Sequence, residues 1–112
     1  MTYKVKLTNT ALGQLKDTIG YISKVLLEPE IARSWSDRIK KEILSLDHMP
    51  FRCPLVEEEP WRTEGIHKMT VDNFIVYYWI NEATCTVWVT AVIYGRRDQI
   101  AVLRNMPKHD EC

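Results

Sequence analysis

The sequence predicts a single α+β domain in the order β-α-α-β-β-β, with an N-terminal helix hairpin packed on one face of a mainly antiparallel sheet. Two segments with helical spacing of apolar residues follow a short segment that alternates in period two. Three apolar segments joined by short turns come later in the chain. A length of 112 residues suits one such domain and is too short for two. We expect the domain to span residues 1–104 and residues 105–112 to form a polar tail.

The first strand and helix follow from residues 3–26. Residues 3–8 alternate between polar and apolar side chains, which predicts a strand, and a polar residue at 8–10 would cap the next helix. Gly13 and Gly20 weaken that helix by about 1 kcal/mol each relative to Ala, and small residues there would allow close helix packing. The predicted apolar stripe of the helix is Leu12, Leu15, Ile19, Ile22 and Leu26.

The second helix begins near Pro29, a residue suited to the first turn of a helix because its missing N–H costs nothing there. Met49-Pro50 would end it. The link between the helices is short, so we expect them to lie antiparallel. The apolar stripe of this helix is Ile31, Trp35, Ile39, Ile43 and Leu46.

Three strands are predicted after a connector at 50–64, which is rich in proline and glutamate and which we expect to be extended and exposed. They span 66–71, 74–80 and 84–94, and a last short strand is possible at 100–103. The third should alternate throughout, with Cys85, Val87, Val89, Ala91 and Ile93 on one face and Thr84, Thr86, Trp88, Thr90, Val92 and Tyr94 on the other. The sheet face opposite the helices would then be partly open and polar, with Trp88 as its largest apolar side chain.

Composition excludes several classes of protein. Fifteen basic residues balance fifteen acidic ones, which argues against a dedicated nucleic-acid binder that grips phosphates over a wide surface. The three cysteines form no paired spacing, so we expect no disulfide framework, no metal site and no cofactor. Neither a membrane span of about 20 apolar residues nor a signal peptide is recognisable. The expected location is the cytoplasm, with no membrane partner.

One group of residues has the chemistry for cleaving a phosphodiester through its 2′-hydroxyl. That reaction needs an acid, a base and cations on the phosphate. His67 would transfer protons, and Lys68, Arg96 and Arg97 would stabilise the charge. The alternative is structural: the arginines pair with Asp98 or a helix end, and His67 is an ordinary half-exposed strand residue. His67 and Lys68 are adjacent in a strand, so they should face opposite ways.

Four motifs, taken in order, give the chain a resemblance to the RelE/ParE superfamily of type II toxins. The resemblance covers residues 3 to about 100, which is most of the chain. The motifs are Ala11-Leu12-Gly13-Gln14-Leu15, Asp47-His48-Met49-Pro50, Val71-Asp72-Asn73-Phe74-Ile75-Val76-Tyr77-Tyr78 and Val92-Ile93-Tyr94-Gly95-Arg96-Arg97-Asp98.

The resemblance implies a bacterial toxin, of the plasmid-stabilisation type, that a cognate antitoxin holds inactive. The antitoxin would use a helix and an extended segment, in grooves beside the helix hairpin and across the sheet. ParE-like members inhibit DNA gyrase, whereas RelE-like members cut mRNA in the ribosome. The neutral charge favours ParE, as does Ile75, which stands where RelE-like members carry an arginine.

The expected site residues differ between the alternative functions. Lys68, Arg96, Arg97 and His67 are catalytic only if the chain is an mRNA interferase. Contacts with the target or the antitoxin would come from Tyr94, Arg96, Arg97 and Trp88. The chain alone is not expected to bind nucleic acid sequence-specifically. A further reading is a non-toxic protein that binds an antitoxin in autorepression.

Overall fold

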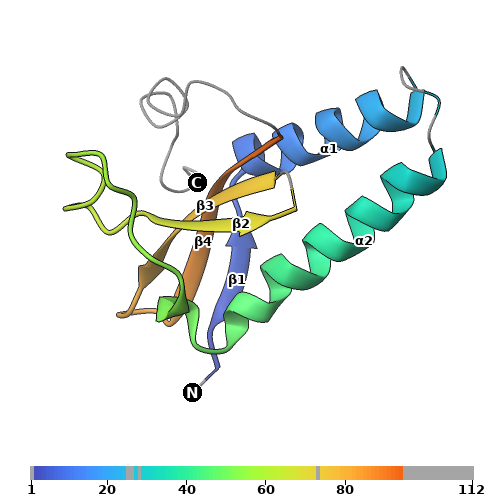
Figure 1. Cartoon of the computed structure of the whole chain (residues 1–112). Coiled ribbons are helices and arrows are strands. Elements are labelled where there is room, and N and C mark those ends of the chain that lie inside the picture. Colours follow the sequence, from blue (N-terminus) through green and yellow to red (C-terminus); the bar gives the residue numbers. More distant parts are fainter. Residues whose placement is uncertain (1, 25–26, 28, 73, 95–112) are drawn as a thin grey trace.

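A helix hairpin packs against one face of a four-stranded sheet (Figure 1). The computed structural model describes residues 2–24, 27, 29–72 and 74–94, apart from the side chains of Tyr21 and Ile22. In chain order, the elements are β1 (Lys4–Leu7), α1 (Asn9–Lys24), α2 (Pro29–Leu44), β2 (His67–Val71), β3 (Phe74–Asn81) and β4 (Thr86–Tyr94). The strand order is β1-β4-β3-β2, with β1 parallel to β4 and the other pairs antiparallel. The predicted class and element order are therefore confirmed.

Local signals fix the starts of both helices. The Ala11 N–H donates to Thr8 Oγ1 at 3.1 Å, so Thr8 is the residue that caps α1. Pro29 begins α2, as predicted. The predicted end of α2 was late by several residues, because the helix stops at Leu44 and tightens into a 3₁₀ turn at Ser45–Asp47. None of the described helices has the length and apolarity to cross a membrane.

The main core lies between the hairpin and the sheet. Leu15, Ile39 and Ile43 are buried there, as their stripes predict. Leu12 and Ile31 were predicted in the same stripes, yet they are 39% and 43% exposed. For Ile31 the reason is its place in the first turn of α2, at the joined ends of the two helices, which project well beyond the described strands in Figure 1. Leu12 lies at the other end of α1 and lines an open apolar pocket with Leu7 and Leu44.

A β-bulge in β4 makes the predicted alternation wrong beyond Val89. Tyr77 on β3 pairs with Ala91, whereas the next residue, Tyr78, pairs with Val89, so Thr90 is an extra residue on β4. Its hydroxyl donates to the Tyr77 carbonyl at 3.2 Å. The faces therefore exchange: Val87, Val89 and Val92 belong to the helix-side core, whereas Ala91 and Ile93 point to the opposite face. The strand also begins at Thr86, because Cys85 has a positive φ of 50° in the preceding turn.

A second apolar cluster covers part of the face away from the helices, which the sequence predicted to be open and polar. Its buried members are Val56, Ile66, Tyr77, Ala91 and Ile93, with Trp61, Ile75 and Trp79 packed against them. Trp88 is thus not the main apolar feature of this face. The connector supplies part of the cluster by folding back onto β2, where Val56 N–H donates to the Ile66 carbonyl at 2.9 Å.

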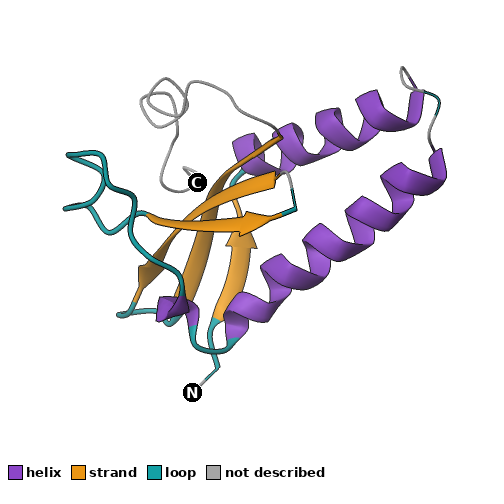
Figure 2. Cartoon of the chain, viewed as in Figure 1, coloured by secondary structure: helices purple, strands orange, loops and turns teal. Residues whose placement is uncertain are grey.

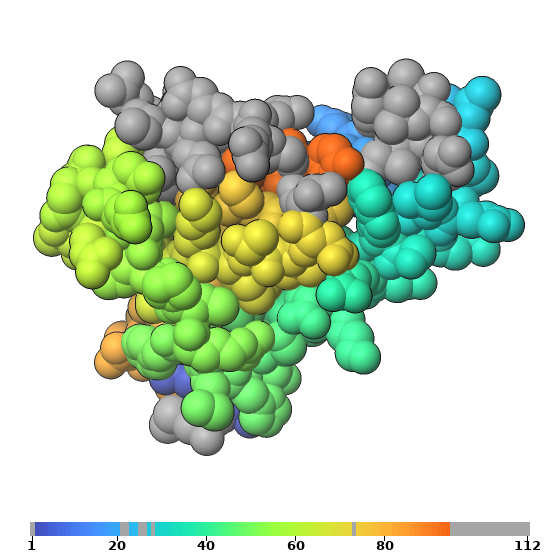
Figure 3. All heavy atoms as spheres, in the orientation of Figure 1, coloured from blue at the N-terminus to red at the C-terminus, as the bar shows by residue number. Residues whose placement is uncertain are grey.

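The connector is a compact loop rather than an extended segment, although most of its residues are exposed, as predicted. It contains a 3₁₀ turn at Pro50–Arg52, an isolated bridge between Leu55 and His67, and a turn that ends at Gly65 with φ +86°. Figure 2 draws most of it as loop, and Figure 3 shows it in green shades gathered beside β2, on the other side from the cyan end of the helix hairpin.

Candidate functional site

His67 is a packed residue at the start of β2. Only 8% of it is exposed, and its Nδ1 lies 2.8 Å from the Cys53 carbonyl oxygen, which accepts the hydrogen bond. Its ring stacks on Tyr78 with centroids 5.1 Å apart and meets the edge of Phe51 at 6.1 Å. The predicted half-exposed position was therefore wrong, and these contacts give the imidazole a structural role.

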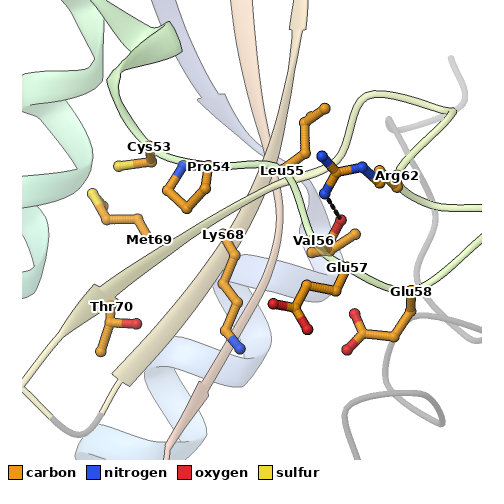
Figure 4. A pocket seen from close by; sticks show the side chains of 10 residues that line it. All are labelled: Cys53, Pro54, Leu55, Val56, Glu57, Glu58, Arg62, Lys68, Met69 and Thr70. Carbon is orange, nitrogen blue, oxygen red and sulfur yellow. Dashed lines mark hydrogen bonds between the residues drawn. The ribbon is translucent and has the colours of Figure 1, made fainter.

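Lys68 faces the other way, as predicted for a neighbouring strand residue. It lines a cavity of about 570 Å³ between β2 and the connector. Arg62 lines the same cavity and donates to the Val56 carbonyl at 3.3 Å. Figure 4 shows Glu57 and Glu58 on the same side of the cavity as the Lys68 side chain. Two carboxylates therefore balance two cations in this cavity.

The strand register separates His67 from the far end of β4. His67 pairs with Tyr78, whereas Tyr94 pairs with Phe74, four residues away along β3. At about 3.3 Å per residue this is roughly 13 Å. The structure therefore does not bring His67 together with Tyr94. Arg96 and Arg97 lie outside the described residues, as do the predicted strand at 100–103 and tail at 105–112.

Tyr94 and Trp88 lie on opposite faces of the sheet. The Tyr94 ring is 5.4 Å from that of Trp35 and 5.3 Å from that of Phe74, on the helix side. Trp88 lies on the other face, with the Lys6 Nζ 5.6 Å from its ring centroid. The bulge at Thr90 causes this separation, because an unbroken alternation would place both rings on one face. The two predicted contact residues thus belong to different surfaces.

An apolar groove runs along the helix hairpin. One part, of about 450 Å³, is lined by Leu12, Leu15 and Ile19 together with lysines at 16, 24 and 40. A second part, of about 190 Å³, shares Leu12 and Leu15 and adds Leu44, which is 61% exposed. We call these two parts the helix groove. The family resemblance predicted a groove beside the hairpin but did not say which residues line it. The sequence feature that could have identified them is the apolar stripe of the first helix, which continues past the sheet.

The titratable groups with shifted pKa values have structural causes. Burial, together with the nearby Glu58 carboxylate, raises the pKa of Tyr77 to about 12. Burial also raises the pKa of Tyr78, whose hydroxyl donates to the Pro50 carbonyl at 2.7 Å. Hydrogen bonds from the hydroxyl and N–H of Thr63 lower the pKa of Glu59. Within the described ranges, no three His, Cys, Asp or Glu side chains are placed to hold a metal ion.

Comparisons with solved structures identify the fold. The chain resembles the chromosomal ParDE toxin–antitoxin system from P. aeruginosa, with a TM-score of 0.68 and 16% identity, over 85% of this chain and 98% of that one. It resembles the RelBE2 toxin–antitoxin complex from Mycobacterium tuberculosis, with a TM-score of 0.59 and 20% identity, over 84% and 99%. It also resembles a mutant of the E. coli toxin RelE in the free state, with a TM-score of 0.60 and 14% identity, over 93% of each chain.

The family assignment comes from the sequence itself. Among curated proteins, none matches the chain significantly. The family model for the ParE toxin of the type II toxin–antitoxin system parDE matches residues 5–99, which is most of the chain. The chain therefore belongs to the ParE toxin family of type II toxin–antitoxin systems.

Proposed function

We propose that this chain is a cytoplasmic toxin that inhibits DNA gyrase and that a cognate antitoxin neutralises. The choice of gyrase depends on the surroundings of His67 and Lys68, the two candidate residues for RNA cleavage that the structure describes. His67 is buried against Tyr78 and Phe51, and Lys68 shares its cavity with Glu57 and Glu58. A site for RNA cleavage needs an accessible proton carrier and an excess of positive charge at the phosphate.

The helix groove supports the antitoxin part of the proposal. An apolar groove is the usual receptor for an amphipathic helix, which places apolar residues in it at spacings of three and four. The lysines at 16, 24 and 40 around the groove favour acidic residues on the flanks of that helix. We therefore expect an antitoxin segment that is helical, apolar on one face and acidic beside it. Arg96 and Arg97 remain proposed contacts with the target.

The test of target is induced expression in a bacterial host that lacks the antitoxin. We expect growth arrest with a DNA-damage response and no new RNA 5′ ends inside translated codons. The double variant His67→Gln, Lys68→Ala serves as the matched comparison and should still arrest growth. New RNA ends that disappear in this variant would overturn the choice of gyrase.

The second candidate function is an mRNA interferase. It is favoured by one observation, the presence of Lys68, Arg62 and Thr70 in the lining of one cavity of about 570 Å³, a volume within the range of small-molecule sites. In this case, Lys68→Ala, Arg96→Ala and Arg97→Ala would each reduce ribosome-dependent cleavage in a purified system. Unchanged cleavage in all three variants would remove these residues from the site.

The antitoxin interface is tested by co-purification with the product of the adjacent reading frame. Leu12→Glu places a charge in the helix groove and should abolish co-purification. Thr70 is also exposed and lies on the other side of the sheet, so Thr70→Glu should leave co-purification intact. A chain that is stable alone and has no affinity for that product would contradict the antitoxin proposal. Failure of expression to slow growth would instead favour a non-toxic role in autorepression.

A further inference from the structure

The sheet carries a surface of tryptophan and lysine that neither the helix groove nor the Lys68 cavity includes. The register aligns residues of β1, β4 and β3 in two adjacent rows across the sheet. One row is Lys6, Trp88 and Trp79, and the other is Lys4, Thr86 and Asn81. We call these six residues the Trp–Lys face.

Packing shows which way these side chains point. Tyr3, Val5 and Leu7 contact the helix-side core, so Lys4 and Lys6, which alternate with them, project to the opposite face of the sheet. Trp79 packs beside the second cluster, on the same side as those lysines. The contact of Lys6 Nζ with the Trp88 ring, at 5.6 Å, joins β1 to β4 on this face.

We propose that the Trp–Lys face binds single-stranded nucleic acid without sequence preference. Bases would stack on Trp88 and Trp79, and phosphates would contact Lys4 and Lys6. Both lysines are exposed, and each tryptophan keeps part of its surface accessible. Aromatic side chains on a sheet surface with cations beside them are the arrangement that holds unpaired bases, because every base has a π-face.

The charge and shape of the face favour this ligand over an acidic peptide. None of the six side chains carries a carboxylate, and the two exposed lysines supply positive charges that would attract phosphates. Peptides are recognised by pockets for side chains or by strand addition at a sheet edge. The cavities described above are lined by other residues. Lys6 lies over Trp88 on a flexible stem, so its ammonium can move from the ring to a phosphate. Binding at this face would not depend on which target the toxin inhibits.

The test is fluorescence anisotropy with labelled ten-nucleotide oligo-dT and oligo-U between 50 and 200 mM salt, with a duplex for comparison. Both single strands should bind more tightly than the duplex. Two phosphate contacts predict a slope of about −1.4 for log K against log salt concentration. The double variant Lys4→Glu, Lys6→Glu should weaken binding at least about tenfold, and Trp88→Ala about fivefold to a hundredfold.

The matched control is Lys16→Glu, Lys40→Glu, which makes the same charge change in the helix groove and should leave affinity within about twofold. Thermal melting shows whether each variant folds. If Trp88→Ala does not fold, the lysine variants alone test the proposal. No binding at 50 mM salt would overturn the proposal. An equal loss in the control pair would do the same. So would binding of a Glu/Tyr copolymer peptide in preference to both oligonucleotides.

Discussion

Gln14 on α1 accepts a hydrogen bond through its Oε1 from the backbone N–H of Val92 on β4, with N and O 2.9 Å apart. The register explains why a side chain is needed there. The pairing of β1 with β4 ends at Leu7 and Val89, where the chain turns into α1. Beyond that point no strand of the described residues pairs with β4 on this side, and Gln14 takes the place of a strand carbonyl.

Replacing Gln14 should therefore destabilise the fold. Gln14→Met keeps the length of the side chain and removes the acceptor, which leaves the N–H of a residue that is 1% exposed without its partner. We expect a loss of about 1–3 kcal/mol in the free energy of unfolding, measured by urea denaturation. Gln14→Glu retains an acceptor oxygen and should lose less. Equal stability of Gln14→Met and the parent chain would contradict this role.

Replacement by alanine should change the stability of the fold in opposite directions at Gly13, which lies in a helix, and at Gly65, which has a positive φ. A Cβ added at Gly13 in α1 meets no atom within 4 Å, so the expected need for close packing was wrong there. Gly13→Ala should stabilise the fold by up to about 1 kcal/mol through helix propensity. Gly65 has φ +86°, and Gly65→Ala should cost about 1–2 kcal/mol. Thermal denaturation of both variants measures the difference, and a fall in melting temperature for Gly13→Ala would refute the first expectation.

Stability should decline at alkaline pH because of Tyr77. Its pKa is raised to about 12 in the folded chain, whereas the unfolded phenol titrates near pH 10. The unfolded state thus loses its proton first, so the stabilisation is complete below pH 10 and is lost as pH rises toward 12. Tyr77→Phe should flatten the dependence of unfolding free energy on pH above 9. A dependence as steep as that of the parent chain would assign the effect to other groups.

The imidazole of His67 should be dispensable for growth inhibition. His67→Gln keeps a donor for the Cys53 carbonyl and removes both the acid–base group and the stack on Tyr78. We expect about 1 kcal/mol less stability, from the lost aromatic pair, and undiminished growth arrest at equal soluble protein level. Complete loss of toxicity in a folded His67→Gln variant would return His67 to a catalytic role.

Much of the fold follows from local patterns, and the differences have identifiable physical origins. The helical spacing of apolar residues predicts both helices, and Pro29 predicts the start of the second. The short turns between the last three strands predict that these strands pair antiparallel. The bulge at Thr90 leaves no such signal, because β4 is apolar on both sides of it and reads as unbroken alternation. The second cluster was missed because Val56 and Trp61, which contribute to it, belong to a connector rich in proline and glutamate.

The candidate site was less accessible to prediction than the fold. The opposite orientation of His67 and Lys68 follows from the alternation of side chains along a strand, and the structure confirms it. The burial of His67 depends on Phe51 and Tyr78, which reach it only in the folded chain. The balance of charge around Lys68 likewise requires the connector to fold back, which sequence spacing does not encode.

The most direct test of the central claim is the supercoiling of relaxed plasmid DNA by purified gyrase in the presence of the purified chain. Inhibition should increase with the concentration of the chain and should be relieved when the chain is first mixed with its cognate antitoxin. Full supercoiling at saturating concentrations of a folded, growth-inhibiting chain would contradict the proposal that gyrase is its target.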